Sequence, residues 1–156
     1  MTLPGPETGE RNNEICYRLT DWAKKNGTGR VFSPLTLFFL PNGAKRAPGA
    51  AWISREHWDS LTDKQRKGPL PLCPDFVLEL MSPSGRRPVR FKMLQAKMDE
   101  YIENGVQLAW LIDPFKKNVY TYRPDKPVEC LENPTTIYGD PVLPGFIFQI
   151  TEVWQQ

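Results

Sequence analysis

The chain has 156 residues, of which 40% are hydrophobic, and a formal net charge of +2 at pH 7. This length and apolar fraction suffice for one folded domain with its own core. No apolar run reaches the roughly 18 residues that a membrane span needs, and residues 1–9 lack the pattern of a secretory signal. We therefore expect a cytoplasmic protein without a membrane partner. The small net charge is not by itself the mark of a nucleic-acid-binding protein.

Cysteine and histidine usage excludes several kinds of site. The three cysteines, Cys16, Cys73 and Cys130, lie far apart without a CxxC pair, which indicates free thiols and no zinc finger. His57 is the only histidine, so a multi-histidine metal site is excluded and a surface or packing role is favoured. The sequence contains neither a G-x-S-x-G elbow nor a phosphate-binding P-loop.

The N-terminal segment predicts a tail and a helix. We expect residues 1–9, which contain two prolines and two glycines, to form a flexible tail. Apolar residues recur at helical spacing over residues 10–25, with Asn12 or Asn13 as the N-cap and Gly27 beyond the end. This spacing predicts an amphipathic first helix.

Two extended runs follow the helix. Residues 31–40 and 46–53 flank the dipeptide Asn42-Gly43, which accepts the positive φ angles of a tight turn. The two runs therefore predict an antiparallel hairpin. Residues 54–71 are polar and basic, and they predict a short helix followed by a loop.

One carboxylate stands inside an apolar strand pattern. Residues 75–81 predict a strand, and alternation places Glu79 on the same face as Val77 and Met81. A carboxylate is costly to bury without a partner. Glu79 is therefore expected to face a cation, a metal ion or a solvated cleft.

The next elements predict a parallel crossover. Residues 90–104 carry an apolar stripe at helical spacing, and Lys97 flanks that stripe. The apolar run 108–112 is typical of a central strand covered on both faces. Strand, helix and strand in this order imply a right-handed crossover between two parallel strands. Another hairpin is predicted over residues 118–122 and 128–131.

The predicted order gives an α/β fold, with a mixed sheet flanked by helices and extra β-hairpins, as a single domain over residues 10–156. Four motifs carry a family resemblance: Pro74-Asp75-Phe76-Val77-Leu78-Glu79-Leu80-Met81-Ser82-Pro83, Lys97-x-x-x-Tyr101-x-x-x-Gly105-Val106, Trp110-Leu111-Ile112-Asp113-Pro114 and Leu143-Pro144-Gly145-Phe146. With these motifs the chain resembles the Uma-two family of restriction-endonuclease-like domains, part of the PD-(D/E)XK nuclease superfamily. The resemblance covers nearly the whole chain.

The resemblance implies a metal-dependent endonuclease that hydrolyses phosphodiester bonds in DNA. Glu79 would bind Mg²⁺ or Mn²⁺, and Lys97 would orient the attacking water and steady the charge that develops on the phosphate. The ion would lower the pKa of the water and polarise the phosphate. Met81 stands where the superfamily commonly has a lysine, and in this branch the helical lysine replaces it.

One position departs from the family pattern. Gly49 follows a proline where the family has a metal-binding aspartate, so the resemblance implies a weakened metal site and impaired cleavage. Glu14 on the first helix is the best candidate to compensate. Asp75 is a poorer one, because four residues of strand separate it from Glu79 by roughly 13 Å.

A basic cluster lies between the acidic strand and the next helix. Arg86, Arg87, Arg90 and Lys92 would contact the phosphate backbone of a nucleic acid if this end of the strand is the active edge. The alternative is a solvated loop. For Glu79 the alternative is a purely structural ion pair, with Lys97 or with an arginine.

Two functions from different classes remain. The first is a DNA endonuclease impaired at Gly49, which cuts weakly or not at all. The second is a catalytically inactive nuclease-like fold that serves as a nucleic-acid-binding or protein-interaction module. A homodimer formed through an exposed strand edge is a further alternative.

Overall fold

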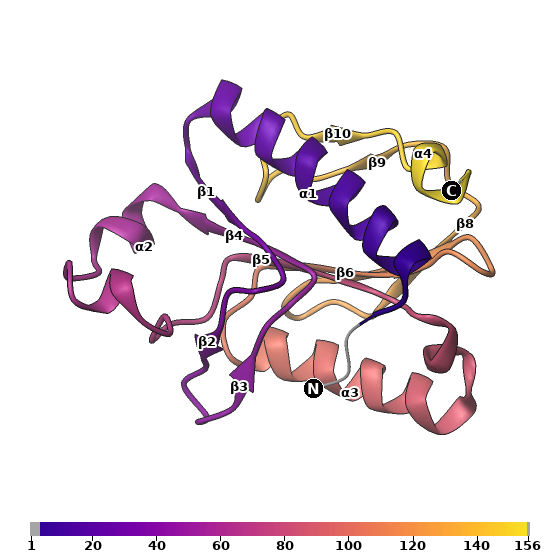
Figure 1. The fold of residues 1–156 in the computed structure, drawn as a ribbon, viewed down its shortest axis with the longest axis horizontal. Helices are drawn as coiled ribbons and strands as arrows, with labels where there is room; N and C mark the ends of the chain where they lie inside the picture. The colour runs from indigo at the N-terminus through magenta and orange to yellow at the C-terminus, as the bar shows by residue number, and fades with distance from the viewer. Residues whose placement is uncertain (1–3, 156) are drawn as a thin grey trace.

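The computed structural model describes residues 4–155 as a mixed α/β fold built on one central sheet (Figure 1). Six strands form this sheet in the order β1-β4-β5-β6-β7-β8. Only β5 and β6 are parallel, and the other neighbours are antiparallel. The strands are β1 (Gly29–Phe32), β4 (Ala50–Ser54), β5 (Phe76–Leu80), β6 (Leu108–Asp113), β7 (Asn118–Tyr122) and β8 (Glu129–Glu132).

Short elements surround the sheet. Two small antiparallel pairs join β2 to β3 and β9 to β10. None of the helices within residues 4–155 has the length and apolar character needed to cross a bilayer. The short elements around the sheet are β2 (Phe38–Phe39), β3 (Lys45–Arg46), α2 (Arg55–Asp59), the 3-10 helices η1 (Gln65–Lys67) and η2 (Pro83–Arg86), β9 (Ile137–Tyr138), β10 (Ile147–Phe148) and α4 (Thr151–Trp154).

Helix α1 (Pro6–Asn26) covers one face of the sheet (Figure 1). The helix begins at a proline, which has no N–H group and so leaves no unsatisfied donor at this position. It ends at Gly27, which adopts a left-handed conformation with φ 73°. The predicted helix and its C-cap are confirmed. The predicted asparagine N-cap is wrong, because the proline-led start lengthens the helix at that end. The predicted tail is also wrong over residues 6–9, which are helical, while its residues 1–3 lie outside the described part.

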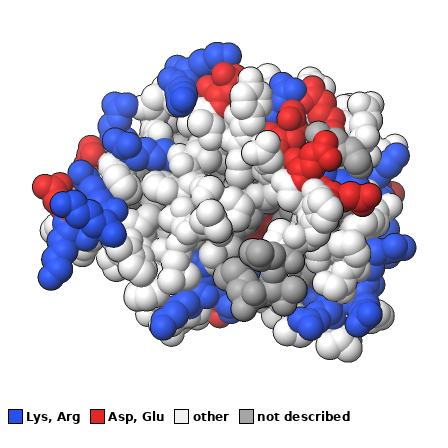
Figure 2. All heavy atoms as spheres, in the orientation of Figure 1, with Lys and Arg blue, Asp and Glu red and all other residues white. Residues whose placement is uncertain are grey.

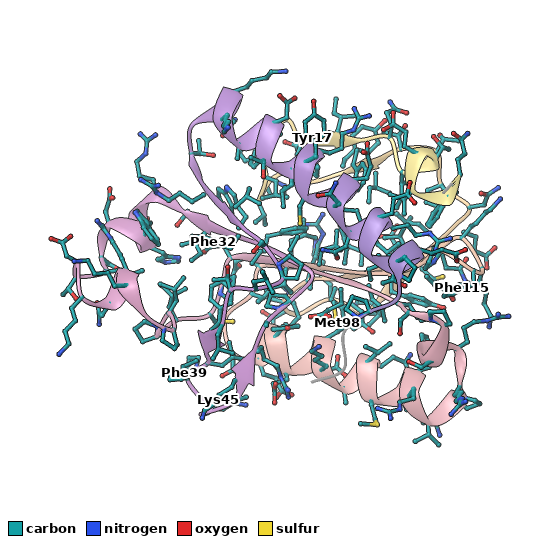
Figure 3. The ribbon with its side chains drawn as sticks, in the orientation of Figure 1. Tyr17, Phe32, Phe39, Lys45, Met98 and Phe115 are labelled. Carbon is teal, nitrogen blue, oxygen red and sulfur yellow. The ribbon has the colours of Figure 1, made fainter. Side chains whose placement is uncertain are left out.

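Helix α3 (Pro88–Glu103) covers the opposite face (Figure 1). Met98 and Tyr101 are its buried residues, and Figure 3 shows Met98 between the helix and the sheet. The helix connects β5 to β6, whose parallel register pairs Glu79 with Leu111. The predicted crossover between two parallel strands is therefore confirmed.

Alternation along β5 divides the core into two layers. Phe76 and Leu78 belong to the cluster that packs under α1, whereas Val77 belongs to the cluster that packs against α3. Glu79 follows the parity of Val77 and faces α3, as predicted. Strand β6 is buried along its whole length, which fits a central strand covered on both faces.

The antiparallel pairing of the predicted hairpins is confirmed, but the strands of the first hairpin are shorter than predicted. β1 pairs with β4, and β2 pairs with β3 around Gly43, which has φ 89°. Each predicted run is thus broken into two short strands. The predicted helix and loop of residues 54–71 correspond to α2 and η1, and the later hairpin to β7 and β8.

Candidate functional site

Glu79 lies near the end of β5 and is only 8% exposed. Both of its carboxylate oxygens have partners from α3. The hydroxyl of Tyr101 donates a hydrogen bond of 2.8 Å to Oε1, and Nζ of Lys97 lies 3.3 Å from Oε2. The carboxylate is therefore compensated by one neutral donor and one cation.

Helical spacing explains why both partners reach the same carboxylate. Lys97 and Tyr101 are four residues apart, so they lie one turn apart on one face of α3. Burial, followed by the charge of Glu79, strongly raises the pKa of the Tyr101 hydroxyl. Tyr101 therefore stays protonated over the physiological pH range and acts as a hydrogen-bond donor.

A second ion pair joins the β2–β3 hairpin to α3. Nε of Arg46 donates to Oε1 of Glu100 over 2.7 Å, and this bond lowers the pKa of Glu100 and raises the pKa of Arg46. The hairpin is also held at its turn, where the backbone N–H of Asn42 donates to Oδ1 of Asn104 over 3.0 Å. The hairpin and the helix are therefore fixed to each other at two points.

A cavity of about 510 Å³ opens beside these pairs. Glu79 does not itself line it, but its partner Lys97 does, and we call it the Glu79 cavity. Three cations line it, together with two serine hydroxyls and an apolar wall. Two of the cations are already in ion pairs, with Glu79 and Glu100, while Arg90 is exposed on α3. Its lining residues are Arg46, Leu80, Ser82, Ser84, Gly85, Arg90, Met93, Leu94, Ala96, Lys97 and Glu100.

Gly49 precedes β4, where the backbone bends out of the ladder. The side-chain amide of Asn12 donates to the Gly49 carbonyl over 2.9 Å. A Cβ at position 49 would lie 2.7 Å from Oδ1 of Asn12 and 3.0 Å from the carbonyl oxygen of Leu78, and its three nearest atoms do not include Glu79. In this conformation, the space that a Cβ at position 49 would need is occupied by Asn12 of α1 and by the backbone of β5.

The residues do not fit a divalent metal ion. Within residues 4–155, no three acidic, histidine or cysteine side chains form a group that could hold a metal. The oxygens of Glu79 contact Tyr101 and Lys97, and the one carboxylate that lines the cavity, Glu100, is paired with Arg46. Hard cations such as Mg²⁺ are commonly held by carboxylates, and both of these carboxylates already have a cationic partner.

Glu14, the predicted compensating acid, lies away from Glu79. It is on α1, which covers the other face of the sheet, and its carboxylate accepts a 2.8 Å hydrogen bond from Arg18. Arg18 also pairs with Glu152 of α4, and its hydrogen bond lowers the pKa of Glu14. The structure therefore does not bring Glu14 together with Glu79 and Lys97.

Asp75 is buried at the other end of β5. It accepts hydrogen bonds of 2.8 Å from the backbone N–H of Ser54 and 3.0 Å from Nδ1 of His57. These contacts fix the junction between β4 and α2, which is a structural role. The single histidine is thus a partner of this carboxylate.

The four predicted phosphate-binding residues lie in different places in the structure. Arg90 lines the Glu79 cavity, and Arg87 and Lys92 are exposed. Arg86 instead lies over the ring of Phe115, 5.2 Å from its centroid, at the turn after β6 (Figure 3). Of the four, only Arg90 is positioned in the cavity.

From the sequence, no site role was assigned to Tyr101, Arg46 or Glu100. Tyr101 carried a usable signal, because it stands one helical turn after Lys97. Arg46 and Glu100 carried none, since 54 residues separate the partners of their pair. Only the folded hairpin brings them together.

Comparison with known proteins is consistent with this geometry. A sequence profile of the Uma2 family, described as "Putative restriction endonuclease", matches residues 1–151. Among solved structures, the chain is similar to a crystal structure of "a putative nuclease belonging to DUF820" from Anabaena variabilis, with a TM-score of 0.80 and 17% identity, over 99% of this chain and 83% of that one. No curated protein matches the chain. The likeness confirms the predicted nuclease-like fold.

Proposed function

Because this chain belongs to the Uma2 family, we propose that it binds the phosphate backbone of DNA in the Glu79 cavity, with little or no magnesium-dependent cleavage. One observation carries the proposal. The cavity is lined by Arg46, Arg90 and Lys97, while the carboxylates that a metal would need are already used. Phosphates are recognised by such cations, and their release of counterions makes binding salt-dependent.

The roles of the cations differ. Arg90 has no carboxylate partner among the described residues, so it can contact a phosphate directly. Lys97 is held by Glu79 and would share its donors between that carboxylate and a phosphate. The hydroxyls of Ser82 and Ser84, 3.0 Å apart, add neutral donors at the same end of the cavity.

A second candidate is a slow, metal-dependent endonuclease. The contact between Lys97 and Glu79 favours it, because the family resemblance assigns catalytic roles to these two residues. In this case a divalent ion would have to bind Glu79 beside Lys97 or in its place. Binding without metal is therefore the better-supported function.

The test compares binding and cleavage in one set of samples. Fluorescence anisotropy with a labelled DNA duplex should give an affinity that is no higher in Mg²⁺ than in EDTA, because Mg²⁺ competes as a counterion of DNA. Arg90→Gln should weaken the affinity roughly fivefold at low salt. Lys67→Gln, an exposed cation of η1 outside the cavity, is the control and should leave the affinity unchanged. The proposal would be contradicted if binding requires Mg²⁺ or if Arg90→Gln leaves the affinity unchanged.

Plasmid nicking separates the two candidates. We expect no nicking with Mg²⁺ or Mn²⁺ above that of a Glu79→Gln variant. Nicking by the natural chain that Glu79→Gln abolishes would establish the endonuclease instead. The light-scattering mass of the same samples tests the predicted homodimer.

A further inference from the structure

A second cavity of about 420 Å³ lies where the end of α1 meets β1 and α2. We call it the α1–α2 cavity, and it shares no residue with the Glu79 cavity. Its volume is within the range of small-molecule sites and exceeds the needs of a bare ion. The lining residues are Thr20, Ala23, Lys24, Gly27, Gly29, Arg30, Val31, Arg55, Trp58 and Asp59.

The charges of this cavity are not compensated by acids. Within residues 4–155, none of its three cations, Lys24, Arg30 and Arg55, forms an ion pair. The one carboxylate of the lining, Asp59, lies 3.9 Å from Arg66 of η1. Three cations against one carboxylate leave a lining charge of +2. Figure 2 shows basic side chains along this edge and acidic ones gathered over the other end of α1.

Only one of the three cations is bonded to the end of helix α1. The N–H of Gly27 donates to the carbonyl of Ala23, and the Arg55 guanidinium donates to the Gly27 carbonyl. These bonds satisfy groups that a helix terminus leaves open. Lys24 and Arg30 are not used in this way, and they remain available for an anion.

One wall of the cavity is flat and partly apolar. The guanidinium groups of Arg30 and Arg66 both lie over the ring of Trp58, each 4.9 Å from its centroid, and of these two arginines only Arg30 lines the cavity. Gly29 begins β1 and lets this strand lie against β4, because a Cβ there would come within 2.5 Å of the Trp52 indole. A stacked arginine beside two cations resembles the surfaces that hold a phosphate together with a sugar or base.

We propose that the α1–α2 cavity binds the phosphate group of a nucleotide, either free or within a nucleic acid strand. Lys24 and Arg30 contact the phosphate, and the Arg30–Trp58 stack packs against the attached nucleoside. The site is separate from the Glu79 cavity, so its test does not depend on the function proposed above.

The experiment is an NMR titration of the full chain with three probes: inorganic phosphate, adenosine 5′-monophosphate and a short single-stranded oligonucleotide. Amide signals of residues 24–30 and 55–59 should shift and saturate. Lys24→Gln and Arg30→Gln should each weaken affinity about tenfold. Lys25→Gln is the matched control, since the neighbouring lysine pairs with Asp21 at 3.0 Å and lies outside the cavity. It should change affinity less than twofold.

The probes also separate the sources of the phosphate. Binding of the mononucleotide that Lys24→Gln weakens supports a free nucleotide as ligand. Binding of the oligonucleotide alone, with the same loss, supports a strand. The proposal is overturned if no probe gives saturable shifts at these amides, if oligonucleotide shifts are confined to the Glu79 cavity, or if both variants bind within twofold of the natural chain. Because Lys24 has an exposed side chain without an ion pair, its variant should fold even if Arg30→Gln does not.

Discussion

The two cavities contain the same number of basic side chains and use them differently. In the Glu79 cavity, Lys97 and Arg46 are paired with carboxylates from other elements, at 3.3 Å and 2.7 Å. In the α1–α2 cavity, none of the three basic residues has such a partner among residues 4–155. A basic residue in a pair fixes the fold, because its loss leaves a carboxylate uncompensated. The loss of an unpaired one such as Lys24 leaves no carboxylate uncompensated, so it affects mainly what the surface binds.

The largest effect expected from this difference is on folding stability at Lys97. Lys97→Ala leaves the buried Glu79 carboxylate with Tyr101 as its one remaining partner. It should lower the free energy of unfolding by about 3 kcal/mol. This value is at the lower end of the range for a broken buried pair, because Lys97 is partly exposed. Urea unfolding at pH 7 measures this loss. Lys24→Ala, at the unpaired cavity, is the control and should stay within about 0.5 kcal/mol of the natural chain.

A double variant sharpens the same comparison. Lys97→Ala combined with Glu79→Ala removes both charges, and it should recover part of the stability lost by Lys97→Ala alone. Equal losses for Lys97→Ala and Lys24→Ala would mean that pairing does not distinguish the two cavities.

A smaller effect is expected from restoring the acid at position 49. Gly49→Asp places a Cβ against Asn12 and the Leu78 carbonyl, so it should destabilise the fold by about 2 kcal/mol through overpacking. Calorimetric titration should detect no tight Mg²⁺ site. Asn12→Ala together with Gly49→Asp should relieve part of the strain. A Gly49→Asp variant that binds Mg²⁺ and remains as stable as the natural chain would show that the backbone turns toward Glu79.

The smallest expected effect concerns pH and the pair of Glu100 with Arg46. Arg46 holds the pKa of Glu100 below its ordinary value of 4.5, so the pair stabilises the folded state above that pH and loses this contribution as the pH falls through the lowered value. Glu100→Gln should cost about 1 kcal/mol at pH 7, since the pair is partly exposed, and less in acid. Urea unfolding at several pH values measures the difference. In an Arg46→Gln background, the pH dependence of this difference should disappear.

Local patterns in the sequence were sufficient for the centre of the fold. Alternation along β5 predicts the face of Glu79, and the helix that follows can return Lys97 only to the covered side of a parallel crossover. Both inferences depend on neighbours within one strand or one helix. The meeting of Lys97 with Glu79 follows from them, and the structure places their polar ends 3.3 Å apart.

The remainder of the site depends on contacts that no local pattern encodes. Glu14 and Arg86 have side chains suited to a metal or phosphate site. In the structure, however, Glu14 contacts Arg18 and Arg86 contacts Phe115, outside the Glu79 cavity. The carbonyl of Gly49 accepts a hydrogen bond from Asn12, which is 37 residues away. Choice among alternative partners is a property of the packed molecule, so residue type and spacing could not predict it.

Phe115 illustrates how far one side chain in a turn can reach. Guanidinium groups from α1 and η2 lie over its ring, at 5.8 Å for Arg11 and 5.2 Å for Arg86. The ring therefore links segments that pack on opposite sides of the sheet, each contact contributing on the order of 0.5–1 kcal/mol. Truncating it should increase local opening both at the first turns of α1 and at η2, so one substitution would raise hydrogen exchange in two segments that are distant in the sequence.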